Sequence, residues 1–337
     1  MRLLLTGSTG FIGRNLLLAA IRSGIYREIL VPVRSKEKLT AQILGDGFES
    51  VPKMITPLVC SAADWNFRGL GDLDHVVHSA GVIQAGTKEE YFRTNVEGTL
   101  RLFASLPPTR RILVLSSQTA AGPTKGDRAY QVESDRPSPI TWYGHSKLEM
   151  ERRLQLEFAE QPYLCLRPPF LLGPRDQMTL PLFKMARGFV HFKPGLKPKY
   201  FSFLAVEDVV DAIFCALKDP TDWTTLPSRI FFLSHTEPVT DVDMIEAAAE
   251  ACGSRGVRFP VPQTLLRGIS RIIDAVPTWR AAIPMLTIDR AQEIWPNRWV
   301  VSSETFSKRF AWRPKKSLRE TMKETRDWYV RTGQLRE

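Results

Sequence analysis

The stretch LLLTGSTGFIGRNLLLAAI, close to the N-terminus, constrains the fold more than any other part of this 337-residue chain. An apolar run leads into a turn that contains Gly7, Gly10 and Gly13, and an amphipathic run follows. A strand, a glycine turn and a helix in this order let the backbone approach a pyrophosphate, which lies on the helix N-terminus where free N–H groups favour anions. The stretch therefore predicts a dinucleotide-binding unit. A tight turn without a ligand is the alternative.

Short β-rich runs and helical patterns alternate through the first half of the chain. The strands are expected at residues 2–6, 28–33, 56–60, 75–80, 111–117 and 163–168, and the clearest helices at 11–23, 89–105 and 142–160. Such alternation predicts a parallel sheet covered by helices on both faces, an α/β fold of the doubly wound Rossmann type. Pro32 fits only near a strand end or at a sheet edge, because proline lacks a donor for the ladder.

After the sixth expected strand the alternation weakens and prolines become frequent. We expect residues 1–168 to form the dinucleotide-binding domain and residues 169–337 to form a smaller, interleaved substrate-binding region. A helical run at 206–217 and the strand-like RIFFL that follows it lie within residues 200–234. This segment is expected to add the last helix and strand to the main sheet.

Cysteine spacing and hydropathy limit the cellular setting. The four cysteines lie far apart, without the CxxC or histidine-rich spacing of a metal site, so we expect a reducing cytoplasm and no bound metal. No run approaches the ~18 apolar residues of a membrane span. The apolar start lacks a basic region followed by a long hydrophobic core, so no signal peptide is expected.

The net charge of +10 raises the question of which partner a basic surface would meet. Many of the excess Lys and Arg residues lie after residue 298, and no helix-turn-helix, zinc-finger or RNA-binding signature accompanies them. We therefore expect no nucleic acid partner. A solvated basic surface is the first interpretation, and contact with an anionic lipid or a phosphorylated ligand is the second.

The segment WYGHSK places Tyr143 and Lys147 four residues apart, on the same face of an expected helix. An ammonium group beside a phenol favours the phenolate, so we expect Lys147 to lower the pKa of Tyr143 and make it a usable acid or base near neutral pH. His145 lies between them but points off this face, and we do not expect it to be catalytic. An ordinary solvated helix face is the alternative.

Cofactor selectivity is set at the end of the second expected strand, where the sequence is VPVRSKEK. An Asp or Glu there would bind the adenosine ribose hydroxyls and repel a 2′-phosphate. The acid is missing, and Arg34 and Lys36 follow the strand instead. This pattern favours NADP. NAD, with the two cations merely exposed on the next helix, is the alternative.

Seven motifs in one order resemble those of the extended short-chain dehydrogenases/reductases, the NAD-dependent epimerase/dehydratase family. They are TGSTGFIG, HSAG, NVEGT, SSQTAAGP, YGHSK, LRPPFLLGP and VEDVVDA, and they span nearly the whole chain. SSQTAAGP and YGHSK are most similar to the 3β-hydroxysteroid dehydrogenase and dihydroflavonol reductase branches. The resemblance implies the Rossmann fold and a nicotinamide cofactor that exchanges a hydride with the substrate carbon.

The resemblance also assigns catalytic roles. Ser117 would polarise the substrate oxygen, with Ser116 as the one-residue alternative. Tyr143 would exchange a proton with that oxygen, while Lys147 would lower the pKa of Tyr143 and bind the nicotinamide ribose. Asn95 matches a family asparagine beside the active site, and a helix-packing amide is its other interpretation.

The cofactor-binding residues that the resemblance implies come from seven segments. They are Thr6, Gly7, Thr9, Gly10, Phe11, Ile12, Gly13, Arg34, Lys36, Asp64, Ser79, Ala80, Gly81, Ser116, Tyr143, Lys147 and Pro168. Asp64 resembles the acid near the adenine, although Cys60 and Ser61 replace the usual Gly-Asp before it.

The residues after Ser117 narrow the reaction. Sugar-nucleotide dehydratases of this family carry an Asp-Glu pair there, whereas this chain has Gln118 and Thr119, so dehydration is not expected. We expect an NADP-dependent oxidoreductase that interconverts a secondary alcohol and a ketone on a hydrophobic, steroid-, flavonoid- or acyl-like substrate. A sugar-nucleotide epimerase with tightly bound NAD and a catalytically silent NADP-binding sensor are the alternatives.

Two further expectations concern partners. The run PQTLLRGISRIIDAV, at 262–276, places Leu265, Leu266, Ile269, Ile272, Ile273 and Val276 on one helical stripe. Such a stripe forms core, a lid beside a hydrophobic pocket, or a helix in peripheral contact with a membrane. We also expect a homodimer, because helices matching 89–105 and 142–160 form a four-helix interface in many family members.

Overall fold

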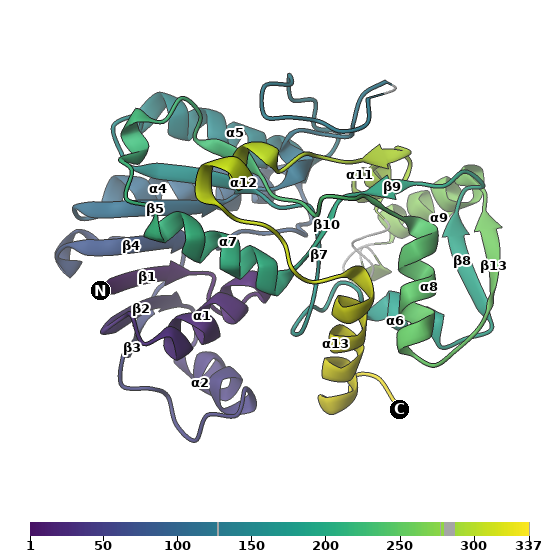
Figure 1. The fold of residues 1–337 in the computed structure, drawn as a ribbon, viewed down its shortest axis with the longest axis horizontal. Helices are drawn as coiled ribbons and strands as arrows, with labels where there is room; N and C mark the ends of the chain where they lie inside the picture. Colours follow the sequence, from purple (N-terminus) through teal and green to yellow (C-terminus); the bar gives the residue numbers. More distant parts are fainter. Residues whose placement is uncertain (127, 277, 280–286, 337) are drawn as a thin grey trace.

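The computed structural model describes residues 1–126, 128–276, 278–279 and 287–336 (Figure 1). Its main sheet contains β1 (Arg2–Thr6), β2 (Glu28–Val33), β3 (Ile55–Val59), β4 (Leu73–His78), β5 (Thr109–Leu115), β6 (Tyr163–Arg167) and β11 (Ile230–Phe232). These seven strands lie in the order β11-β6-β5-β4-β1-β2-β3, and all neighbours are parallel. The order reverses between β1 and β4, which confirms the doubly wound α/β fold.

Helices cover both faces of this sheet, so its strands are apolar along their length. One face carries α1 (Phe11–Ser23), α2 (Lys36–Gly45) and α7 (Val206–Lys218), and α1 packs against α7 (Figure 1). The other face carries α4 (Gly98–Ser105) and α5 (Trp142–Glu157), which also pack together. Leu4 and Leu5 of β1, which point to opposite faces, are both fully buried.

Two details differ from the sequence prediction. The helix expected at 89–105 is divided into α3 (Lys88–Phe92), a π-helical turn (Arg93–Glu97) and α4. The helix expected at 142–160 ends at Glu157, because Phe158 leaves the helical conformation. Pro32 is the next-to-last residue of β2, past the three residues that pair with β1, so its missing N–H removes no bond from that ladder.

The C-terminal half contributes to the main sheet and builds a second layer beside it. Helix α7 and strand β11 belong to the main sheet. The second layer contains the helices α6 (Leu180–Ala186), α8 (Asp241–Ala251), α9 (Gln263–Ala275), α11 (Ile288–Ala291) and α13 (Leu318–Arg331). Helix α12 (Glu304–Phe310) instead packs on the core of the main sheet through Phe306 and Phe310. Helices α6, α8 and α13 enclose a separate core that includes Phe183, Met322 and Tyr329.

Short strands complete this second layer. Strands β7 (Phe170–Leu172) and β10 (Phe203–Ala205) form one pair, and β8 (Val190–Pro194) and β13 (Val257–Val261) form another. A three-stranded sheet joins β12 (Val239–Thr240), β9 (Tyr200–Phe201) and β14 (Arg298–Trp299). Figure 1 shows β8 and β13 at the far end of the molecule from the main sheet.

No helix among the described residues is long and apolar enough to cross a membrane. No group of three or more His, Cys, Asp or Glu side chains in the same part of the chain could hold a metal ion.

Candidate active site

The glycine turn after β1 is so tight that two of its positions exclude a side chain. Gly7 has φ +73°, and a Cβ there would lie 2.6 Å from the backbone nitrogen of Ala80. A Cβ on Gly13 would lie 2.1 Å from the carbonyl oxygen of Gly7. Glycine at both positions therefore lets α1 start directly against the turn, and lets the turn lie against the loop after β4.

The N-terminus of α1 has the properties of a phosphate cradle. Gly10 caps the helix without a side chain and is exposed to solvent, and a Cβ there would lie 3.3 Å from the carbonyl oxygen of Gly7. Thr9, Phe11 and Ile12 are partly exposed around it, and the hydroxyl of Ser8 is buried with no hydrogen-bond partner among the described residues. Helix N–H groups and the helix dipole favour an anion there. These residues fit the pyrophosphate of a dinucleotide.

Thr6 holds the loop after β4 beside the glycine turn. Its hydroxyl lies 2.7 Å from Nδ1 of His78 and accepts a hydrogen bond from the backbone nitrogen of Ala80 at 3.3 Å. The hydroxyl of Ser79 donates to the carbonyl oxygen of Thr6 at 2.8 Å. Burial lowers the pKa of His78 to about 3, so this histidine is neutral and structural.

The ends of β2 and β3 lie at the same edge of the sheet, where the backbone nitrogen of Cys60 donates to the carbonyl oxygen of Val33 at 2.9 Å. Arg34 and Lys36 are exposed directly after β2. Asp64 lies in the turn after β3, where it accepts a hydrogen bond from the Ser61 hydroxyl at 2.5 Å. At this edge of the sheet, the exposed side chains of Arg34 and Lys36 carry positive charge. The carboxylate of Asp64 is hydrogen-bonded to Ser61 within the turn after β3.

Ser117 and Tyr143 are brought together by a close helix contact. Ser117 caps a 3₁₀ turn (Gln118–Ala120), and its hydroxyl accepts bonds from the backbone nitrogen of Thr119 at 3.2 Å and the Thr119 hydroxyl at 2.9 Å. A Cβ on Gly144 would lie 2.5 Å from the carbonyl oxygen of Thr119. Because position 144 is glycine, α5 packs directly on this turn, which brings the phenol of Tyr143 beside the hydroxyl of Ser117.

The pKa of Tyr143 does not follow the sequence prediction. Burial raises the pKa of Tyr143 to about 12, and the hydrogen bond from Ser117 and the charge of Arg290 only partly oppose this rise. Lys147 instead donates to the carbonyl oxygen of Leu115 at 2.8 Å. The expected lowering by Lys147 is therefore wrong for this structure, because removing the phenolate from water outweighs the nearby positive charge.

Lys147 lies on the same buried helix face as Tyr143. Burial lowers the pKa of Lys147 to about 8, while the carboxylate of Glu151, one turn further along α5, opposes that decrease. A Cβ on Gly81 would lie 3.4 Å from the Lys147 Nζ and 3.0 Å from Asn95 Oδ1. The loop after β4, which leads from the glycine turn, therefore passes beside the Lys147 ammonium.

Asn95 is fully buried in the π-helical turn, a feature that is frequent at functional sites. Its amide nitrogen donates to the Val82 carbonyl oxygen and to the Ser146 hydroxyl, both at 3.0 Å, and its Oδ1 accepts from the Val82 nitrogen at 2.8 Å. These bonds attach the loop after β4 to α5. In this structure Asn95 is a positioning residue for the loop that lies beside Lys147.

Ser116 and Pro168 lie next to this centre. The hydroxyl of Ser116 is buried and has no hydrogen-bond partner among the described residues, whereas Ser117 is bonded to Tyr143. The carbonyl oxygen of Pro168 accepts a bond from the backbone nitrogen of Gln118 at 2.9 Å. His145 is exposed, away from the Tyr143 and Lys147 face.

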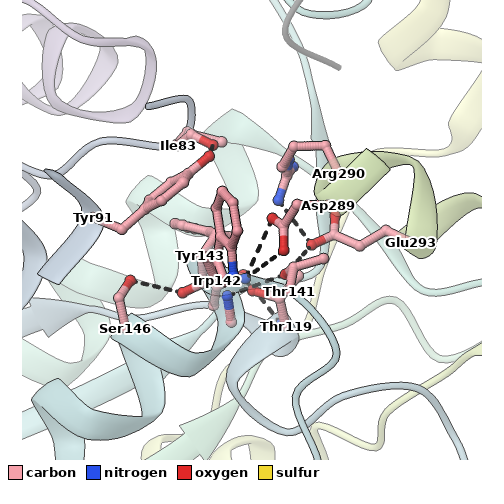
Figure 2. Close-up of polar contacts among 12 residues, drawn as sticks. Ile83, Tyr91, Thr119, Thr141, Trp142, Tyr143, Ser146, Asp289, Arg290 and Glu293 are labelled. Atoms are coloured by element: carbon pink, nitrogen blue, oxygen red, sulfur yellow. Dashed lines mark hydrogen bonds and ion pairs between the residues drawn. The ribbon is translucent and has the colours of Figure 1, made fainter. Parts of the chain in front are cut away.

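A charged cluster that was not predicted from the sequence lies beside Tyr143. The guanidinium of Arg290 lies 5.3 Å from the centre of the Tyr143 ring and bonds to Glu293 at 2.7 Å. The Thr141 hydroxyl, at the start of α5, donates to the same Glu293 oxygen at 2.7 Å (Figure 2). Asp289 accepts a bond from the backbone nitrogen of Trp142 at 3.0 Å. The only sequence signal was a short charged run, IDRAQEIW, nearly 150 residues from the motif it contacts.

A cavity of about 300 Å³ opens beside this cluster. Its walls include the aromatic rings of Tyr91 and Trp142, the charged side chains of Asp289 and Arg290, and Asp274 of α9. The Tyr91 and Tyr143 ring centres are 6.1 Å apart, so the cavity adjoins the Ser117–Tyr143 pair. The cavity therefore combines two aromatic rings with several charged and polar groups, so it can pack against an apolar part of a ligand and orient that ligand by polar contacts.

The doubly wound sheet, the glycine cradle and the group of Ser117 with the buried Tyr143 and Lys147 define a nicotinamide dinucleotide enzyme of the oxidoreductase and epimerase class. A sequence model described as the NAD dependent epimerase/dehydratase family matches residues 3–225. The chain belongs to this family.

Curated relatives match from about half to nearly all of the chain, at low identity. A ceramide reductase from Caulobacter vibrioides is 24% identical over 337 residues, covering 98% of this chain and 95% of the relative. A 3 beta-hydroxysteroid dehydrogenase/Delta 5-->4-isomerase from Mycobacterium tuberculosis is 24% identical, covering 80% and 74%. The ketoreductase sphI from Aspergillus fumigatus is 31% identical, covering 52% and 60%.

Solved structures agree on the fold. The UDP-glucuronic acid 4-epimerase from Bacillus cereus, in complex with UDP-glucuronic acid and NAD, superposes with a TM-score of 0.76 at 16% identity, covering 98% of this chain and 100% of that one. At this identity the likeness establishes the architecture and not the substrate.

Proposed function

We propose that the protein is an NADP-dependent oxidoreductase that interconverts a secondary alcohol and a ketone on a hydrophobic substrate. The observation that carries the proposal is the placement of Ser117 beside the buried Tyr143, with the buried Lys147 one turn along the same helix face. The pair lies at the carboxyl ends of β5 and β6, where open α/β sheets bind their ligands. It also adjoins the cavity lined by Tyr91 and Trp142.

The state of Tyr143 favours the reductive direction near neutral pH. A phenol with a pKa of about 12 keeps its proton there, so it can donate that proton to a ketone oxygen. Ser117 is placed to donate a hydrogen bond to the same oxygen, and Lys147, with a pKa of about 8, supplies positive charge on the same face of α5. The bound nicotinamide cofactor supplies the hydride.

The relatives support an apolar substrate. Three relatives are called a ceramide reductase, a ketoreductase and a hydroxysteroid dehydrogenase. Each of these names describes the chemistry of an alcohol or a ketone. Gln118 and Thr119 stand beside Ser117, and neither can supply the acid and base of a dehydration. The alternative is a sugar-nucleotide epimerase, the activity of the solved structural neighbour, and it would require NAD that stays bound through turnover.

Cofactor consumption separates these functions. NADPH absorbance should decrease when the protein is mixed with one of a panel of long-chain and steroid ketones, and no UDP-sugar should be epimerised. NAD that co-purifies with the protein, together with epimerisation of a UDP-sugar, would instead establish the alternative. Tight NADPH binding without turnover on any ketone would favour a sensor.

The pH dependence should differ between the two directions. Ketone reduction needs protonated Tyr143, so its rate should be nearly constant up to about pH 8 and then decrease as Lys147 loses its charge. Alcohol oxidation needs the phenolate, so its rate should rise with pH over the same range, by up to about tenfold per pH unit. Turnover numbers measured in both directions test this, and an oxidation rate independent of pH would contradict it.

Arg34 and Lys36 should set the preference for NADP over NAD. Both are exposed after β2 and can pair with a 2′-phosphate, a charge-assisted contact. In the Arg34→Ala/Lys36→Ala variant, the ratio of the two dissociation constants should change by about tenfold or more, because NADP binding alone weakens. Lys38→Ala, an exposed cation further along α2, is the matched control. Tighter binding of NAD than NADP by the unmodified protein would refute the assignment.

A further inference from the structure

The pair of strands β8 and β13 carries an unpartnered apolar face. Val190 pairs with Val257 and Phe192 with Phe259, and these four side chains are 43%, 58%, 54% and 57% exposed. The alternate residues of β8, His191 and Lys193, are buried against the protein. Because side chains alternate along a strand, one face of the pair packs inward and the other is apolar and open to solvent.

Two flanking residues extend this face. Phe189 precedes β8 and Leu196 follows it, and they are 73% and 83% exposed. The six residues Phe189, Val190, Phe192, Leu196, Val257 and Phe259 are called the ribbon face below. So many exposed aromatic and aliphatic side chains on and beside one pair of strands are uncommon on a protein that meets only water.

Helix α9 begins two residues after β13 and continues the apolar surface. Leu265 and Ile272 are seven residues apart, on the same side of the helix, and each is 56% exposed. Of the predicted stripe only Ile273 is fully in the core. The stripe is therefore only partly core. Its exposed residues fit the other two interpretations, a lid beside a hydrophobic pocket or a helix in contact with a membrane surface.

The charge around this surface is strongly one-sided. Residues 187–197 and 255–276 contain seven Lys and Arg and a single acid, Asp274. Lys193 is paired with Asp241 and Arg258 with Glu246. The side chains of Arg187, Lys197, Arg255, Arg267 and Arg271 are exposed to solvent.

This charge decides between the two possible occupants of the surface. A second copy of the chain, related by two-fold symmetry, would bring the same five cations against each other. The predicted homodimer through α4 and α5 would leave the ribbon face open. A bilayer with anionic headgroups meets both features, because exposed aromatic and aliphatic side chains enter the interface while Lys and Arg bind the headgroups.

We propose that the ribbon face and the exposed side of α9 dock the protein on the surface of a membrane that contains anionic lipids. The docking helix also forms part of the active-site cavity, through Asp274, so a lipid-like substrate would enter the cavity beside the bilayer. The entry of a lipid-like substrate rests on the proposed function, whereas docking on the membrane does not.

Flotation with vesicles tests the docking without any substrate. The full-length protein should float with vesicles of phosphatidylcholine containing phosphatidylglycerol, and should remain unbound with phosphatidylcholine alone. Raising the salt concentration should weaken the binding, because headgroup attraction is screened. No binding to the anionic vesicles, or equal binding to both kinds, would overturn the proposal.

Two surface variants assign the binding to named residues. Phe192→Ser/Phe259→Ser should reduce vesicle binding by about tenfold or more, since two exposed rings are removed from the contact. Arg267→Gln/Arg271→Gln should reduce it by about 25-fold, because each cation near an anionic surface strengthens binding about fivefold. All four residues are exposed, so the melting temperature should not change.

Leu156→Ser is the matched control, an exposed apolar residue of α5 outside the surface, and it should bind vesicles like the unmodified protein. Light scattering tests the alternative, in which a second copy of the chain covers the ribbon face. If the unmodified protein is a dimer, fails to bind vesicles, and becomes a monomer in Phe192→Ser/Phe259→Ser, then a second copy covers the face and the proposal is wrong. Ketone reduction of a water-soluble substrate is unaffected by docking, so failure of the proposed function would be seen separately.

Discussion

Replacing Tyr143 with phenylalanine should reduce turnover by about 10²- to 10⁴-fold, the usual contribution of a general acid or base. The variant removes one oxygen, and the ring keeps its contacts with Tyr91 and Arg290. The lost hydroxyl is the partner of Ser117, so the proton donor and its orienting bond disappear together. Steady-state rates with NADPH and a ketone measure the effect.

Tyr91→Phe is the matched control for this substitution. Its ring lies 6.1 Å from that of Tyr143, but its hydroxyl donates to the carbonyl oxygen of Ile83 at 3.1 Å and does not contact Ser117. This variant should keep turnover within a few-fold, while NADPH binding and the melting temperature stay unchanged for Tyr143→Phe. A Tyr143→Phe enzyme that retained more than about a tenth of the turnover would contradict the proton-transfer role.

The parts of the site that the sequence predicts are those defined over a few neighbouring residues. Gly7 and Gly13 stand out because a side chain would collide with the backbone a few residues away or in the adjoining loop. Tyr143 and Lys147 share a helix face because four residues make about one turn. The doubly wound sheet is similarly visible, since strands buried on both faces need continuous apolar runs.

The electrostatics of the site could not be predicted in the same way. The pKa of Tyr143 depends on how completely the folded protein removes its hydroxyl from water, and on Arg290, which is nearly 150 residues away in the chain. Lys147 is close in sequence, but its ammonium is held by the Leu115 carbonyl oxygen, a tertiary contact. Sequence spacing predicts which side chains lie near a titratable group within one helix. The pKa of that group also depends on its burial and on charges from distant segments, which only the complete fold determines.

The helix at 89–105 illustrates the same limit for the backbone. Its hydropathy pattern predicts one continuous helix, yet a π-helical turn interrupts it at Arg93–Glu97. Asn95 lies in that turn and bonds to Val82 and Ser146 in other segments. Hydrogen bonds between distant segments accompany the widened turn. The hydrophobic periodicity of the sequence does not predict such bonds.

Removing the carboxylate of Glu151 should destabilise the protein by about 3–5 kcal/mol, as expected when one partner of a buried ion pair is lost. Arg167 of β6 donates two hydrogen bonds to Glu151 of α5, at 2.9 and 2.6 Å, and both side chains are almost fully buried. In Glu151→Leu the guanidinium of Arg167 would stay buried without its counter-charge. The free energy of unfolding in urea measures the loss.

The same helix supplies a matched control. Glu157 pairs with Arg153 on the solvent side of α5, where both side chains are about 40% exposed. Glu157→Gln should therefore change the free energy of unfolding by less than about 1 kcal/mol, because water and salt already screen the pair. An equal loss for Glu151→Leu and Glu157→Gln would show that burial of the ion pair is not what matters.

The double variant Glu151→Leu/Arg167→Met separates the cost of an unpaired charge from the value of the pair. It removes both charges and fills the space with apolar side chains, which is often neutral for a buried ion pair, so it should recover most of the stability lost in Glu151→Leu. Lys147 would still lack the nearby carboxylate that raises its pKa, so its pKa should decrease in both variants. Ketone reduction should therefore decline at a lower pH than in the unmodified enzyme, even where the fold is restored. A double variant as unstable as the sum of its single variants would show instead that the pair itself holds α5 against β6.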